Sequence, residues 1–156
     1  MVQQGSLKDG YGLLEVSTIK GTDLCFASYR PGTHKAGKLE TDAQQGFVSM
    51  DGANVQSMYL GGGTALKTAG ATLLRNKPGL AYVEKTKSGS YVVGNPSPAD
   101  AAITVTLPAL AGLKAFLVDE QGKRTGPATV TNGQQVGSIS ITLKANTKAE
   151  FVPAGK

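Results

Sequence analysis

The chain has 156 residues, of which 40% are hydrophobic and 17% are charged, and it contains 21 glycines and 7 prolines. A chain of this length buries roughly 70% of the surface that it exposes when unfolded, which is enough for one core. No run approaches the roughly 18 apolar residues of a membrane-spanning helix. The residues after Met1 lack the basic and apolar regions of a signal peptide. We therefore expect neither a membrane-spanning helix nor a signal peptide in this sequence. The net charge of +5 is spread among eleven acids, without a basic tail or arm.

Apolar and polar residues alternate at every second position along most of the chain, which predicts strands that each bury one face. No helical spacing persists without an intervening glycine or proline. The expected strands are Gly12–Ile19, Leu24–Tyr29, Gly46–Met50, Val55–Leu60, Ala71–Leu74, Leu80–Lys85, Ser90–Gly94, Ile103–Leu107, Leu113–Asp119, Ile139–Leu143 and Thr147–Pro153. The pattern indicates an all-β fold, an antiparallel β-sandwich of about 11–12 short strands with little or no helix. A closed barrel is the alternative.

Turn residues separate these strands. Asp51-Gly52 is expected to close a hairpin, and Gly122 is expected to take a positive φ in the polar turn after Asp119. We expect Lys77-Pro-Gly79 to end one strand before the next begins. The chain is predicted to form a single domain over residues 1–156, and Gly61–Gly63 marks its most flexible point and a possible seam between two halves.

The single cysteine, Cys25, alternates with its neighbours as a strand residue does, so we expect a buried thiol. One histidine and one cysteine, without HExxH or CxxC spacing, predict no metal site and no cofactor. The segment Gly61–Lys67 has glycines and a lysine, as phosphate-binding loops do. It lacks the GxxxxGK[ST] order, so a tight turn is the simpler interpretation. An RNP1-like motif and a basic helix are both missing, so no nucleic-acid partner is expected.

The densest positive stretch is Arg30–Lys38, which contains His34 and no acid. One interpretation is a solvated basic loop. Another is a small lyase, in which Tyr29 or His34 moves a proton beside a uronic acid whose carboxylate Arg30 neutralises.

Polysaccharide binding is the third interpretation. Tryptophan is absent, and the five tyrosines and four phenylalanines are mostly spaced as strand residues, so a neutral crystalline glycan is not expected. An acidic polysaccharide fits better, because lysines and arginines can bind its carboxylates or sulfates beside a tyrosine ring. The candidate glycan-binding residues are Tyr29, Arg30, His34, Lys35 and Lys38, with Lys85, Lys87, Lys123 and Arg124 behind them.

Several segments between Tyr59 and Pro153 share one pattern. A Gly-Gly-Thr segment is followed by a strand that ends in Tyr82-Val-Glu84, a strand that enters Asn95-Pro-Ser97, and a last alternating strand before the chain end. This pattern resembles the β-sandwich region that follows the catalytic part of heparinase II/III-type polysaccharide lyases. It is also similar to the C-terminal sandwiches of chondroitin and hyaluronate lyases.

The resemblance implies an accessory module of a secreted or periplasmic bacterial enzyme that acts on uronic-acid polysaccharides. In that family the catalytic residues lie largely on a helical toroid and the adjoining sandwich, and no family catalytic residue falls on a matching position of this chain. The partners that it implies are the catalytic domain of a parent enzyme and an acidic polysaccharide. Two alternatives remain open: a purely structural or interaction domain without glycan binding, and the small lyase described above.

Overall fold

The computed structural model describes residues 1–6 and 8–153, and it consists almost entirely of antiparallel β-strands. The predicted all-β class is confirmed. In chain order the strands are β1 (Val2–Ser6), β2 (Tyr11–Thr18), β3 (Gly21–Ser28), β4 (His34–Ala36), β5 (Leu39–Thr41), β6 (Gln45–Asp51), β7 (Asn54–Thr68), β8 (Ala71–Lys85), β9 (Tyr91–Asn95), β10 (Ala101–Thr106), β11 (Leu113–Val118), β12 (Arg124–Pro127), β13 (Val130–Asn132), β14 (Ser138–Leu143) and β15 (Thr147–Pro153). Among the described residues the one helical element is a 3-10 turn, η1 (Pro108–Leu110).

In the part of the chain that the structure describes, the sheet has fifteen strands rather than the 11–12 expected. Strands β4, β5 and β13 have three residues each and β12 has four, too few for alternation to reveal them. Strands β7 and β8 are instead longer than predicted, at 15 residues each. We expected Gly61–Gly63 and Lys77–Gly79 to separate strands, but these segments lie inside β7 and β8.

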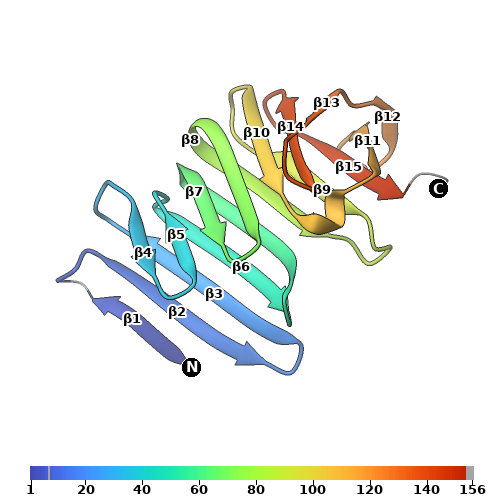
Figure 1. Ribbon diagram of the computed structural model, residues 1–156. Helices are drawn as coiled ribbons and strands as arrows, with labels where there is room; N and C mark the ends of the chain where they lie inside the picture. Colours follow the sequence, from blue (N-terminus) through green and yellow to red (C-terminus); the bar gives the residue numbers. More distant parts are fainter. Residues whose placement is uncertain (7, 154–156) are drawn as a thin grey trace.

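All strands belong to one connected sheet that branches at β7 and β8 (Figure 1). The longer branch has the order β1-β2-β3-β6-β7-β8-β9-β15-β11-β12. The other ends of β7 and β8 pair with β5 and β10, which continue to β4 on one side and to β14 and β13 on the other. The structure therefore does not confirm a sandwich of two separate sheets, because two strands are shared by both branches.

The register of the β7–β8 pair shifts where the two branches meet, at Gly61–Gly63 and Gly63–Ala65. Such bulges bend a strand and increase its twist, which allows one strand to serve two sheets. Gly63 is required here because a Cβ atom on it would lie 2.6 Å from the Cα atom of Ala43. The glycine segment is thus a bend within a strand and not a turn between strands.

Side chains from both branches enter one hydrophobic core. Leu24 and Val48 represent the longer branch and Leu73 and Ile103 the shorter one, and all four are fully buried. Burying each such side chain contributes about 1.5–3 kcal/mol. The hairpin of β4 and β5 covers the core near β2 and β3, where the His34 ring contacts the rings of Tyr11 and Phe26.

Two predicted turns are confirmed and one burial prediction is wrong. Gly52 has φ 59° between β6 and β7, and Gly122 has φ 84° between β11 and β12. Cys25 does occupy a strand, but its thiol is exposed and not buried. Leu24 and Phe26 on either side of Cys25 point into the core, so the alternation places Cys25 on the outer face.

Candidate functional site

The predicted basic stretch lies at one end of the longer branch, after β3. The Tyr29 side chain is 64% exposed, and Arg30, Lys35 and Lys38 are exposed beside it in the sequence. Lys35 belongs to β4 and Lys38 to the turn between β4 and β5. We call residues 29–38 the basic loop. It presents one aromatic ring and three cations to solvent.

His34 holds the basic loop in place. Its Nε2 atom lies 3.0 Å from Ser28 Oγ and 3.0 Å from the Arg30 carbonyl oxygen. Its ring centroid is 4.8 Å from that of Tyr11 and 5.9 Å from that of Phe26. Because Nε2 is occupied by atoms of the chain itself, this geometry favours an anchoring role for His34 over proton transfer to a substrate.

An acidic residue next to the loop offsets part of its charge. Glu40 lies opposite Lys35 across the β4–β5 pair and forms a salt bridge of 3.0 Å with Lys67. The hydrogen bond and charge of Lys67, and then the charge of Lys35, hold the pKa of Glu40 below its usual value. An anionic ligand at the loop would therefore meet Lys35 beside an acid that is already paired with Lys67.

The other predicted cations lie far from the basic loop. Lys85 and Lys87 lie at the end of β8 and in the turn to β9, whereas Lys123 and Arg124 lie in the β11–β12 hairpin. Strands β3 and β12 are seven steps apart in the sheet, which corresponds to about 34 Å. The nine predicted residues are thus distributed over three places.

Arg124 already has partners within the chain. Its Nε atom donates to Glu150 Oε2 at 2.9 Å, and its guanidinium lies 5.0 Å from the centre of the Phe116 ring. The hydrogen bond from Arg124 lowers the pKa of Glu150, and a hydrogen bond from Ser90 acts in the same direction, while burial opposes both. Arg124 therefore links β12 to β15 and is less suited to holding a ligand than the sequence suggested.

The glycine-rich segment Gly61–Lys67 holds an anion from the chain itself. The Asp42 Oδ1 atom accepts hydrogen bonds from the amides of Thr64 at 2.8 Å and Ala65 at 2.7 Å, and Thr64 Oγ1 donates to Oδ2. Burial by itself would raise the pKa of Asp42, but these hydrogen bonds outweigh it and lower the pKa. The amides that could have held a phosphate are occupied by a carboxylate.

A buried polar cluster joins the two branches, and no local sequence pattern predicts it. Arg75 on β8 is 6% exposed, and its Nη2 atom donates to Asn95 Oδ1 at 3.0 Å. Asn95 Nδ2 donates to the carbonyl oxygens of Ala99 and Lys144, and Ser97 Oγ accepts from the Leu80 amide. Asn95 and Ser97 belong to the Asn-Pro-Ser motif, whose side chains here link β8 to β9 and to the end of β14.

Aromatic side chains on the outer face form a second feature that only the register reveals. Phe47, Tyr59 and Tyr82 are direct cross-strand partners on β6, β7 and β8, and each is half-buried. Their strand neighbours Val48, Leu60 and Val83 fill the core. We call Phe47, Tyr59 and Tyr82 the aromatic row.

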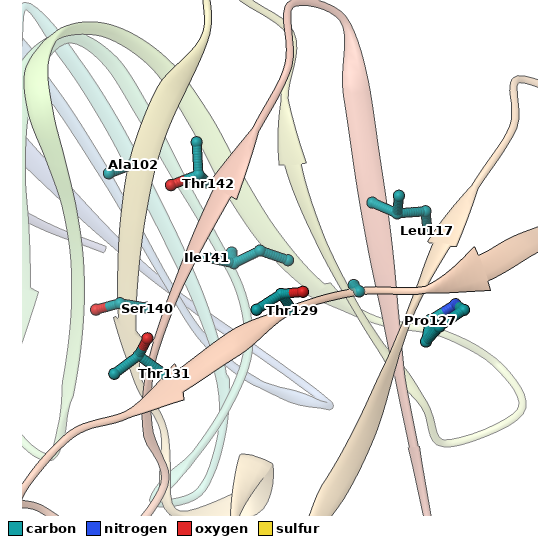
Figure 2. Close-up of a pocket in the computed structure, with 9 residues that line it drawn as sticks. Ala102, Leu117, Pro127, Thr129, Thr131, Ser140, Ile141 and Thr142 are labelled. Carbon is teal, nitrogen blue, oxygen red and sulfur yellow. The ribbon is translucent and has the colours of Figure 1, made fainter.

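A pocket of about 370 Å³ lies over β10 and β14 and the segment that leads into β13. Figure 2 shows the side chains of Thr129, Thr131, Ser140 and Thr142 around it, with Leu117 and Pro127 on the opposite side. Its lining offers hydroxyl groups and apolar surface but no charged side chain. The predicted glycan-binding residues are not among those that line it.

The described residues contain no group of three or more His, Cys, Asp or Glu side chains that could hold a metal ion. Within the same part of the chain, no helix is long and apolar enough to cross a membrane. In comparisons with known proteins, no family model matches the chain and no curated protein is similar to it.

Proposed function

We propose that the chain is a non-catalytic accessory β-domain of a polysaccharide-degrading enzyme, a polysaccharide lyase, and that its basic loop binds an acidic polysaccharide. The observation that carries the binding site is that one short loop exposes the Tyr29 side chain and the cations Arg30, Lys35 and Lys38. Cations recognise the carboxylates or sulfates of such a polymer, and an aromatic ring can pack against a sugar.

The proposal assigns the chemistry to a parent enzyme. The chain has one histidine, and its Nε2 atom is occupied by Ser28 and Arg30. In this proposal the partner of the domain is the catalytic domain of a secreted or periplasmic bacterial enzyme. The resemblance of the segments between Tyr59 and Pro153 to lyase sandwiches supports this part of the proposal.

Binding can be tested with an array of acidic polysaccharides at two salt concentrations. We expect the Arg30→Ala, Lys35→Ala double variant to bind about tenfold more weakly, because two charge-assisted contacts are lost. The affinity of the unmodified chain should fall steeply with salt. Lys20→Ala with Lys144→Ala removes the same charge from other exposed positions and serves as the control. An equal loss of affinity in both double variants would show that only the net charge of the chain matters. That result would refute the basic loop as the site.

A second candidate function is a structural or interaction domain that binds no glycan. It is favoured by an apolar depression of about 410 Å³ on the outer face of β2 and β3, which Gly12, Leu14, Cys25 and Ala27 help to line. Apolar surface of this kind is typical of a contact with another protein part. Strong binding of a hydrophobic dye to the isolated chain, weakened by Leu14→Ser, together with no binding on the glycan array, would favour this candidate.

A further inference from the structure

The aromatic row crosses three neighbouring strands on the face opposite to the core. Direct cross-strand partners have Cβ atoms about 4.5–5.5 Å apart, so Phe47, Tyr59 and Tyr82 form a continuous strip. Each side chain is half-buried, so part of each ring is open to solvent. The strip runs across the strands and continues toward β9 at Gly94, the cross-strand partner of Tyr82.

Two glycines allow the tyrosine rings to lie along the sheet. A Cβ atom on Gly94 would lie 2.2 Å from Tyr82 Cε1, and a Cβ atom on Gly61 would lie 3.3 Å from Tyr59 Cε1. Both glycines are buried, although both lie on the outer face of the sheet. The Tyr82 ring therefore lies over Gly94, and the Tyr59 ring reaches Gly61, an arrangement in which an aromatic ring covers a glycine of the sheet.

Tyr82 also lines a groove of about 580 Å³ that extends the strip toward β15 and β11. The groove contains the side chains of Asp119, Glu120, Asn146 and Lys148, which supply hydrogen-bond donors and acceptors next to the ring. One oxygen of Asp119 accepts from the Lys123 amide at 2.7 Å, while the Glu120 side chain is exposed. Convergent polar groups beside an aromatic surface are typical of small-molecule and oligomer sites.

The chemistry of this surface selects its ligand. The C–H face of a pyranose ring can pack on an aromatic ring, and its hydroxyl groups can donate to carboxylates and accept from lysine or amide groups. Two acids and one lysine line the groove, and Glu84 is exposed two residues after Tyr82, so a polyanion is repelled. We propose that the aromatic row and its adjoining groove bind a single chain of uncharged hexopyranose sugars.

This site differs from the basic loop in place and in charge, and it does not depend on the proposed function. The proposed ligand also differs from the crystalline neutral glycan that the sequence analysis did not expect. Three half-buried rings beside a groove suit one soluble polysaccharide chain. The two sites respond differently to salt: binding at the basic loop weakens as salt rises, whereas binding of an uncharged sugar changes little.

Isothermal titration calorimetry with hexasaccharides of glucose, mannose and galactose tests the site. We expect at least one to bind, with an affinity that is nearly equal at about 50 mM and about 500 mM salt. Tyr82→Ala and Tyr59→Ala should each weaken binding about tenfold, the loss of one stacked ring. Tyr82→Phe, which keeps the ring over Gly94, should stay within about threefold of the unmodified chain. Ile19→Ser, which removes a fully exposed apolar side chain in another place, is the control.

Three results would overturn the proposal. The first is that none of the three hexasaccharides binds at about 10 mM. The second is that folded Tyr59→Ala and Tyr82→Ala variants bind as the unmodified chain does. The third is an affinity that falls about tenfold in the Arg30→Ala, Lys35→Ala double variant, which would assign the sugar to the basic loop. If Tyr82→Ala does not fold, Tyr59→Ala and Glu120→Gln supply the same comparison, with a weaker affinity expected in both.

Discussion

The Nη2 atom of Arg75 donates a hydrogen bond of 3.0 Å to Oδ1 of Asn95, and both side chains are buried where the two branches of the sheet meet. Among the described residues no carboxylate forms a salt bridge with Arg75, and its Nε atom lacks a hydrogen bond. Desolvation lowers the pKa of Arg75. A buried cation without an acid depends on neutral acceptors, and here these are Asn95 Oδ1 and the Lys77 carbonyl oxygen, which accepts from Nη1 at 3.3 Å.

We therefore predict that Asn95→Ala destabilises the fold more than Arg75→Met does. Asn95→Ala leaves the buried guanidinium with the Lys77 carbonyl oxygen as its remaining acceptor and removes the donor to the Ala99, Leu143 and Lys144 carbonyl oxygens, which costs about 2–4 kcal/mol in the free energy of unfolding. Arg75→Met removes the charge and keeps much of the volume, so a loss below about 2 kcal/mol is expected. Urea denaturation of both variants measures the difference, and a larger loss for Arg75→Met would contradict the assignment.

The contact between Tyr82 and Gly94 predicts a second stability effect. Gly94→Ala places a methyl group where the Tyr82 ring lies, so we expect a loss of about 1–3 kcal/mol from overpacking. Gly126→Ala is the matched control, since a Cβ atom there meets nothing within 4 Å and its φ is not positive. Thermal unfolding followed by circular dichroism should show a lower melting temperature for Gly94→Ala alone. Equal melting temperatures would show that the ring moves aside at no cost.

Asp42 predicts acid sensitivity. Its pKa is lowered in the folded state from an ordinary value of 3.8, so its contribution to stability is complete well above pH 3.8 and is lost as the pH falls through the folded pKa. Asp42→Asn should be less stable at neutral pH, and the gap from the unmodified chain should narrow below about pH 4. Urea midpoints over this range measure the gap. A gap that stays constant with pH would mean that the Asp42 carboxylate does not stabilise the bend.

Cys25 predicts rapid chemical modification. Its side chain is exposed on the outer face of β3, so the folded chain should react with a water-soluble thiol reagent at a rate close to that of the unfolded chain. Cys25→Ser should abolish the signal and have little effect on stability. Reaction only after addition of denaturant would show that the thiol is buried, as the sequence pattern had suggested.

The anchored position of His34 predicts no lyase activity for the chain by itself. With Nε2 held by Ser28 and Arg30, incubation with alginate, ulvan, heparin or hyaluronan should give no absorbance from an unsaturated product. His34→Ala should loosen the basic loop and speed its cleavage by trypsin without changing this result. Product formed by the unmodified chain and lost in His34→Ala would establish the small lyase instead.

Much of the fold could be predicted from residue order because alternation is a local property. The strands around Leu24, Ile103 and Ile139 bury every second side chain, as their sequence indicates, and the hairpins at Gly52 and Gly122 depend on turn chemistry within a few residues. The exposure of the basic loop could also be predicted, because it follows from the charges and glycines of one short segment.

Tertiary structure alone decided which residues meet. The partners of Asp42, Arg75 and Tyr82 lie at Thr64, Asn95 and Gly94, and no local pattern specifies such pairings. Packing also decides which of the two alternating sets of side chains in a strand meets the core. In β3 that set contains Leu24 and Phe26, so Cys25 is exposed. Residue order thus determined the strands that are long enough to show alternation, since that pattern depends on neighbours one and two positions away. Packing between distant strands determined the bend of the sheet, the buried arginine and the aromatic row.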